Sequence, residues 1–313
     1  MSESGRGRSN ASRVFIGILS SRVVGFLRDR VIAHFFGAGA HADVFATALR
    51  GPNVLQNLLG EGTISAAFIP IYSRFVEAGK SEEARRFAGA LFGLIFVCAL
   101  VLALVGSLAA PLFVAAFAPG FLGDAARVAA GEASVDRYPI AVLAVRIMFP
   151  MTCVLVLAAW SLGVLNSHRR FLLPYTAPVL WNAAIMAGLF AAGVGVFDIG
   201  AGSRDDRLLI AACAGAFVGA LLQLAVQLPV AIRLIGGLRP SLSLNAPGVR
   251  DALRAFGPVV LGRGVYQLSA YLDLILASLL ATGAVASILR AQALYILPVS
   301  LFGMSVAAAE LPE

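Results

Sequence analysis

The chain has 313 residues, of which 59% are hydrophobic and only 13% are charged, and its formal net charge is +7. Soluble domains carry about 25% charged residues, and a soluble core of this size has no room to hide so much apolar surface. The composition therefore excludes a soluble globular protein and predicts a polytopic membrane protein.

Eight apolar segments follow one another along the chain, and a membrane-spanning helix needs about 20 residues. They predict an all-α fold with about eight transmembrane helices, at 14–36, 42–76, 87–118, 138–165, 173–197, 208–234, 252–281 and 284–309. The second segment is too long for one straight helix. Gly51-Pro52 and Gly60-Glu61-Gly62 offer two places to bend or break it.

Basic residues are concentrated in every second connection between these segments. The N-terminal tail and every second connection together hold 13 of them, whereas the opposite connections hold four, which are Arg127, Arg137, Arg204 and Arg207. Basic loops stay on the cytoplasmic side of a membrane, so the N-terminus is predicted to be cytoplasmic. The same placement explains the positive net charge without a nucleic-acid partner. Residues 245–256 are predicted to form a short amphipathic helix on the inner surface.

The first two segments carry charges that a bilayer makes expensive. Successive helical residues advance by 100°, which places Arg22, Gly25, Arg28 and Asp29 on one arc of the first helix. Arg50, Asn53 and Asn57 share a face of the second. Two polar faces on adjacent helices predict one water-filled cavity between them.

Two interpretations of these charges remain open. In the structural one, Arg22 pairs with Asp29, and Arg50 pairs with Asp43 or Glu61, so that the charges only neutralise one another. In the functional one, the forked donors of the guanidinium groups bind phosphate oxygens. A cluster with excess positive charge suits a diphosphate headgroup better than a cationic drug.

The seventh segment adds a second polar arc, which contains Arg263, Tyr266, Ala270 and Asp273. Arg263 is a further candidate for the cavity wall. Asp273 is either a structural partner of Arg263 or a ligand for a coupling cation. No zinc-ligand spacing, Ser-His-Asp grouping or phosphate-cradling glycine loop is present, so the motifs predict no metal site, no cofactor and no enzymatic chemistry.

The segment from Ser21 to Phe75 resembles the start of the MurJ/MviN family of lipid II flippases. The shared pattern includes Ser21-Arg22, Gly25-Phe26, Arg28-Asp29, the glycine-rich residues 36–39, Asp43, Pro52-Asn53, Glu61-Gly62 and residues 68–70. Further matches occur at 118–121, 257–262, 279–286 and 297–312, so the resemblance covers nearly the whole chain.

The resemblance implies a fourteen-helix fold, with two six-helix lobes and a final pair of helices that holds a lipid tail. Such proteins move the undecaprenyl-diphosphate-linked peptidoglycan precursor across the bacterial inner membrane by alternating access. Residues 1–13 would be a cytoplasmic tail, 14–236 the N-terminal lobe, 237–251 a cytoplasmic linker, and 252–313 the first two helices of a truncated second lobe. The expected partners are the lipid-linked saccharide, membrane lipids and the missing C-terminal half.

The resemblance also implicates arginines at Arg22 and Arg28 and an acid at Asp43. Two departures weaken it: Gln56 stands where the family often has an arginine, and Gln292-Ala293 replaces a common Asp-Arg pair. Arg290 either supplies the missing charge from one turn earlier or is an interfacial arginine. The predicted substrate-binding set is therefore Arg22, Arg28, Asp43, Arg50, Asn53, Gln56, Arg263 and Arg290.

These departures keep other functions open. The substrate is lipid II or another polyprenyl-diphosphate-linked saccharide, and the driving force is the membrane potential or a monovalent cation. An exporter of small cations fits poorly with a basic cavity. An inactive membrane scaffold, which transports nothing, is the alternative from a different class of function.

Overall fold

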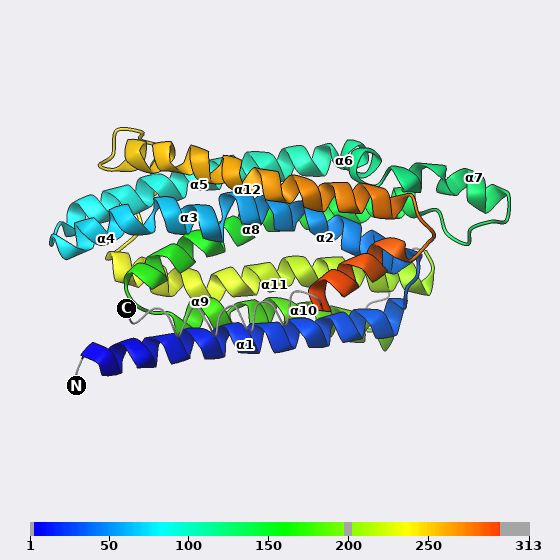
Figure 1. Ribbon diagram of the computed structural model, residues 1–313, viewed down its shortest axis with the longest axis horizontal. Coiled ribbons are helices and arrows are strands. Elements are labelled where there is room, and N and C mark those ends of the chain that lie inside the picture. The colour runs from blue at the N-terminus through cyan, green and yellow to red at the C-terminus, as the bar shows by residue number, and fades with distance from the viewer. Residues whose placement is uncertain (1–2, 197–201, 295–313) are drawn as a thin grey trace.

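A computed structural model describes residues 3–196 and 202–294, although the side chains of residues 3–16, 61, 62, 65 and 266 lie outside the description. Within these ranges every regular element is a helix, so the all-α prediction is confirmed (Figure 1).

Most of the helices run along the long axis of the molecule (Figure 1). The first half of the chain forms α1 (Glu3–Phe36), α2 (Ala40–Leu59), α3 (Glu61–Ala67), α4 (Ile69–Glu77), α5 (Ser81–Leu108) and α6 (Ala110–Phe117). A 3-10 turn at Pro119–Gly123 leads to α7 (Asp124–Ala129), α8 (Arg137–Ser167), α9 (Leu172–Thr176), α10 (Pro178–Gly193), α11 (Arg204–Ile235) and α12 (Val249–Ser278). A last described helix, Ala284–Leu294, is called the 284–294 helix below.

Five of the described helices are long and apolar enough to cross a membrane: α5, α8, the α9–α10 stretch, α11 and α12. The number becomes six if α6 and the segment 119–129, which meet at 99°, form one broken span. The charged α1 and α2 are not among them, so the predicted number of eight is approximate. The last predicted segment, 284–309, lies outside the described residues beyond Leu294.

The long second segment is divided at one of its two predicted positions. Gly60 separates α2 from α3, which confirms a break there. Pro52 lies inside α2 without ending it, and Gly51 next to it packs against Phe149 of α8. We attribute the intact helix to this packing, because contacts along a partner helix offset the cost of an interior proline.

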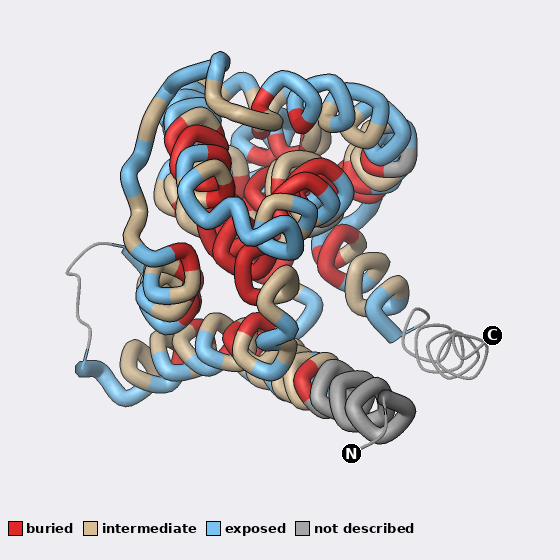
Figure 2. Tube along the Cα trace, turned by 90° about the vertical axis from the view of Figure 1, so that its left-hand side faces the viewer, coloured by how far each residue is buried: buried red, intermediate tan, exposed pale blue. Residues whose placement is uncertain are grey.

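The core is built around α8, which packs against α2, α5 and α11. Its side chains contribute to two hydrophobic clusters that extend toward opposite ends of the bundle. Met148 belongs to the first cluster and Trp160 to the second, and both are fully buried. The buried positions gather inside this group of helices (Figure 2). By contrast, α1 lies mainly against α9 and α10.

Side-chain caps fix where two of the long helices begin. Asp136 accepts a hydrogen bond from the Tyr138 amide at the start of α8. At the start of α11, Ser203 and Asp206 form a reciprocal capping box, and Asp206 also binds His41 of α2 at 2.8 Å. Each cap contributes about 1 kcal/mol. The His41 contact also joins the beginnings of two helices that are distant in sequence.

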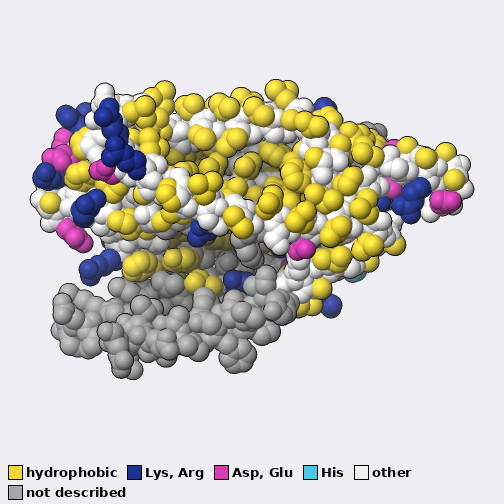
Figure 3. Space-filling view, turned by 45° about the horizontal axis from the view of Figure 1, so that its top comes forward, with side chains coloured by type: hydrophobic (Ala, Val, Ile, Leu, Met, Phe, Trp, Pro, Cys, Tyr) yellow, Lys and Arg dark blue, Asp and Glu magenta, His cyan; other side chains and the backbone are white. Residues whose placement is uncertain are grey.

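The predicted amphipathic helix at 245–256 is wrong as a separate element. Helix α12 begins at Val249 and continues without a break to Ser278. Val249 and Ala252 are buried in the second hydrophobic cluster, so this end of α12 packs against the bundle instead of lying flat on a surface. On the face shown in Figure 3, hydrophobic side chains cover most of the middle and most charged ones lie toward the two ends, as expected for a protein in a bilayer.

Candidate functional site

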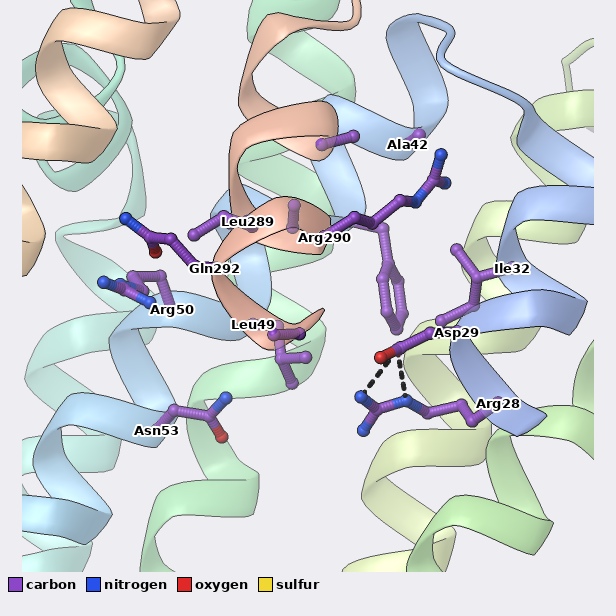
Figure 4. A pocket seen from close by; sticks show the side chains of 14 residues that line it. Arg28, Asp29, Ile32, Ala42, Leu49, Arg50, Asn53, Leu289, Arg290 and Gln292 are labelled. Atoms are coloured by element: carbon purple, nitrogen blue, oxygen red, sulfur yellow. Dashed lines mark hydrogen bonds and ion pairs between the residues drawn. The ribbon is translucent and has the colours of Figure 1, made fainter. Parts of the chain in front are cut away.

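Two adjoining cavities separate α1 and α10 from α2 and the 284–294 helix. The first, called the α2 cavity, has a volume of about 320 Å³ and is lined by α1, α2 and the 284–294 helix. The second, called the α10 cavity, has a volume of about 520 Å³ and is lined by α1, α10 and the 284–294 helix. They share Arg28, Asp29, Arg290 and Ala293, so the two cavities adjoin and are described as one candidate site. Figure 4 shows the side chains that line the α2 cavity.

The polar arc predicted for α1 faces this site. Arg22, Gly25, Arg28 and Asp29 all line the α10 cavity. Phe26 also lines it. The α1 wall therefore combines guanidinium groups with an aromatic ring.

Arg28 is held by three groups on two helices. Its Nη2 lies 2.7 Å from Asp29 Oδ1, and its Nη1 donates to Asn182 Oδ1 at 2.9 Å. The guanidinium also lies 5.4 Å from the centre of the Trp181 ring, within cation–π range. The Asn182 amide nitrogen donates to the Pro178 carbonyl at 3.0 Å, which leaves its oxygen turned toward Arg28.

Asn182 and Trp181 were not found from the sequence. Asn182 is 5% exposed and lies on α10, 154 residues from its partner. The available signal was a single amide side chain in an otherwise apolar segment, a position where a polar group needs a partner. Nothing in the spacing identified which partner that was.

The α2 wall contributes Arg50 and Asn53. Arg50 also donates from Nη2 to the Ala270 carbonyl of α12 at 3.2 Å, which ties α2 to α12. Asn57, the third member of the predicted face, is exposed and outside the lining of both cavities. Thus two of the three predicted polar residues reach the site.

Arg290 lines both cavities, and Figure 4 shows its side chain in the wall of the α2 cavity. Its Nη2 is buried and has no hydrogen-bond partner among the described residues. A guanidinium with an unused donor at this place adds to the positive charge contributed by α1 and α2.

Asp43 lies elsewhere than predicted. Its side chain is fully buried, outside the lining of both cavities, and it binds Arg137 Nη1 at 2.9 Å. It also accepts hydrogen bonds from the amides of Gly283 at 2.7 Å and Ala286 at 2.9 Å, so it caps the 284–294 helix. All of its partners among the described residues are structural, and a substrate role for Asp43 stays a prediction.

Arg137 completes a buried charge cluster. It pairs with Asp124 through Nε and Nη2 as well as with Asp43, and all three side chains are at most 1% exposed. In the sequence, Arg137 lies in a predicted connection on the side opposite the N-terminal tail. The predicted pairs of Arg22 with Asp29 and of Arg50 with Asp43 are wrong, because Asp29 pairs with Arg28 and Asp43 with Arg137. The other partner predicted for Arg50 was Glu61, whose side chain is outside the part of the structure that is described.

Three other predicted residues do not line the two cavities: Gln56, Arg263 and Asp273. Arg263 and Asp273 are exposed on α12. Ten helical residues separate them by about 15 Å, too far for an ion pair. Asp273 accepts instead from Gln292 Nε2 at 3.0 Å, so the expected pairing of Arg263 with Asp273 is wrong.

The two cavities together are lined by five arginines and one aspartate: Arg22, Arg28, Arg30, Arg50, Arg290 and Asp29. Apolar side chains, including Phe26, Trp181 and Leu294, stand beside them in the α10 cavity. Such a wall attracts a multiply charged anion that carries an apolar portion, and it repels small cations. Among the described residues no group of His, Cys, Asp and Glu has the arrangement of a metal site.

A family model described as "Lipid II flippase MurJ" matches residues 32–313. The chain belongs to the MurJ family. Similar MurJ proteins include the "Lipid II flippase MurJ" of Burkholderia cenocepacia, which is 35% identical over 94% of this chain and 54% of its own length. The "Probable lipid II flippase MurJ" of Haemophilus influenzae is 33% identical over 94% of this chain and 55% of its own length. The chain thus spans about half the length of the curated relatives that it matches.

Solved structures show the same fold. A MurJ structure in an "inward closed conformation" has a TM-score of 0.73 and 22% identity, over 95% of this chain and 57% of that one. A transporter of the MOP superfamily from Pyrococcus furiosus has a TM-score of 0.62 and 18% identity, over 95% of this chain and 62% of that one. At these identities the likeness supports the MurJ-like membrane fold alone.

Proposed function

We propose that this chain forms part of a flippase that moves undecaprenyl-diphosphate-linked peptidoglycan precursor, lipid II, across the bacterial inner membrane by alternating access. The observation that carries the proposal is the wall of five arginines and one aspartate around two adjoining cavities. The step moves a molecule without making or breaking covalent bonds, so the protein acts as a transporter and not as an enzyme.

In this proposal Arg22, Arg28 and Arg290 contact the diphosphate. Forked guanidinium donors match phosphate oxygens in geometry and charge. Arg28 is already oriented by Asp29, Asn182 and Trp181, so little side-chain entropy is lost when it binds a ligand. The apolar side of the α10 cavity suits the first part of the lipid chain.

Topology and energy coupling belong to the same proposal. The N-terminus is cytoplasmic, residues 14–236 form the first lobe, and residues 252–313 begin the second. The driving force is the membrane potential or a monovalent cation. Asp273, which accepts a hydrogen bond from Gln292, is the proposed cation ligand.

Binding of a polyprenyl-diphosphate glycolipid to the purified chain in nanodiscs tests the proposal. Arg22→Ala is the sharpest variant, because Arg22 is exposed in the cavity and forms no ion pair with another described residue. A hydrogen bond to a charged group contributes about 1.5–3 kcal/mol, so the affinity should fall by about tenfold to hundredfold. The matched control is Arg263→Ala, which removes an exposed arginine outside both cavities.

Equal affinities of Arg22→Ala and the parent chain would refute the diphosphate role. Rescue of cells depleted of their own lipid II flippase then tests the substrate. Binding without rescue by the corresponding full-length gene would favour another polyprenyl-diphosphate-linked saccharide, and absence of both would favour an inactive scaffold.

A further inference from the structure

The segment between α11 and α12, residues 236–248, is called the α11–α12 linker here, and part of it lies against α5. The Ser241 amide donates to the Gly89 carbonyl at 3.1 Å. A Cβ atom on Gly89 would lie 2.2 Å from the Arg239 carbonyl oxygen, and one on Gly93 would lie 2.3 Å from the Ser241 carbonyl oxygen. Because residues four apart share a helix face, these two glycines together admit the linker backbone against α5.

A cavity of about 390 Å³ opens between the linker and the first turns of α5. That volume lies within the range of about 300–1,000 Å³ typical of small-molecule sites. It shares no lining residue with the α2 and α10 cavities. Its polar wall comes from two elements, with Glu82, Arg85 and Arg86 on α5, and Arg239, Ser241, Ser243 and Asn245 on the linker.

The charges of this wall do not cancel. Glu82 accepts hydrogen bonds from both Arg85 and Arg86, so one carboxylate holds two guanidinium groups at the α5 side. Arg239 faces them from the linker and forms no ion pair with another described residue. Three arginines against one glutamate leave two positive charges in excess.

The remaining polar groups add hydrogen-bond donors. Arg250 donates to Asn245 Oδ1 at 2.8 Å, which leaves the amide nitrogen of Asn245 as a donor. Ser241 and Ser243 add two hydroxyl groups. Guanidinium, hydroxyl and amide donors around an excess of two positive charges match the oxygens and charge of a phosphate dianion.

We propose that this cavity binds a phosphate-bearing anion, and that the bound anion holds the α11–α12 linker against α5. The second part follows from the construction of the site, because the anion bridges Arg85 and Arg86 of α5 to Arg239 of the linker. The linker joins the six-helix portion of the chain to α12, so occupancy restricts how far α12 moves relative to α5. The ligand is either a soluble phosphate compound or the headgroup of an anionic phospholipid.

Two measurements on the purified full chain test the proposal. The first is the dissociation constant of inorganic phosphate in a neutral detergent, measured at constant ionic strength with chloride as the counter-anion. The second is the rate at which proteinase K cleaves the linker in the same detergent, with and without phosphate. The same cleavage is followed in phosphatidylcholine nanodiscs with and without phosphatidylglycerol, which separates the soluble source from the lipid source.

We expect saturable binding of phosphate or slower cleavage in the anionic nanodiscs, and at least tenfold weaker binding by Arg239→Gln. Arg254→Gln is the matched control, because Arg254 is an exposed arginine of α12 outside the cavity and should bind like the parent. Gly93→Ala displaces the linker and should abolish protection while all three arginines remain.

Protection by phosphate in detergent identifies a soluble ligand, and protection only in anionic nanodiscs identifies a headgroup. Either result supports the site. Absence of both effects in the parent chain, or equal losses in Arg239→Gln and Arg254→Gln, would overturn it. Because the glycolipid-binding test uses other residues, its failure leaves this result unaffected.

Discussion

Replacing Arg137 with methionine removes the single cation that two buried carboxylates share. Asp43 and Asp124 are at most 1% exposed, so neither carboxylate recovers its lost partner by turning toward water. Breaking a buried ion pair by removing one partner costs about 3–5 kcal/mol. Arg137 serves both carboxylates, so we expect Arg137→Met to lower the free energy of unfolding by at least that range, a large share of the 5–15 kcal/mol typical of a folded domain.

Circular dichroism during denaturant unfolding in detergent measures this loss. Arg127→Met is the matched control: the Arg127 side chain is 39% exposed and lies 3.5 Å from Asp124, so its removal should cost less than about 1 kcal/mol. Combining Arg137→Met with Asp43→Asn and Asp124→Asn removes all three charges and should recover part of the stability. A loss below about 1 kcal/mol in Arg137→Met, no larger than in the control, would show that the cluster is not a buried ionic network.

Three further changes probe other contacts. Asn182→Leu leaves the charge of Arg28 intact but removes its 2.9 Å hydrogen bond, so glycolipid affinity in nanodiscs should fall by about threefold to tenfold, and an unchanged affinity would contradict the positioning role. Gly120→Ala places a Cβ 1.8 Å from the Ser278 carbonyl oxygen, so the melting temperature should fall, which an unchanged melting curve would refute. Burial, with a smaller contribution from the nearby Arg170, lowers the pKa of His168 below 6.5, so protonation favours the unfolded chain. Stability should therefore decline as the pH falls through about 6.5, and His168→Gln should weaken that decline.

Helical spacing predicted contacts within one helix better than contacts between helices. It grouped Arg22, Gly25, Arg28 and Asp29 correctly, because their relative directions depend only on the 100° step. It did not identify the pairing of Asp43 with Arg137, 94 residues away. Such a pair depends on the rotation and depth of each helix, which packing against neighbours determines.

Charged residues near predicted ends were also misassigned for a physical reason. Arg137 resembles a loop arginine in the sequence, yet it begins α8 and its side chain is buried between two acids. One of the two roles predicted for Asp273 was a pairing with Arg263 on its own helix, but its hydrogen bond comes from Gln292 on the next helix. Composition and hydropathy predict how deep a segment lies, but they do not specify the partner of a single polar group.

The chain contains two tryptophans, and the structure gives them separate surroundings. Trp160 is fully buried in the bundle core, whereas the Trp181 ring lies beside the Arg28 guanidinium in the wall of the α10 cavity. The Trp160→Phe variant therefore leaves a single tryptophan, at the candidate site, and the emission of that indole should respond when a ligand displaces water or moves the guanidinium. The molecule thus carries its own optical reporter of cavity occupancy, with no attached label.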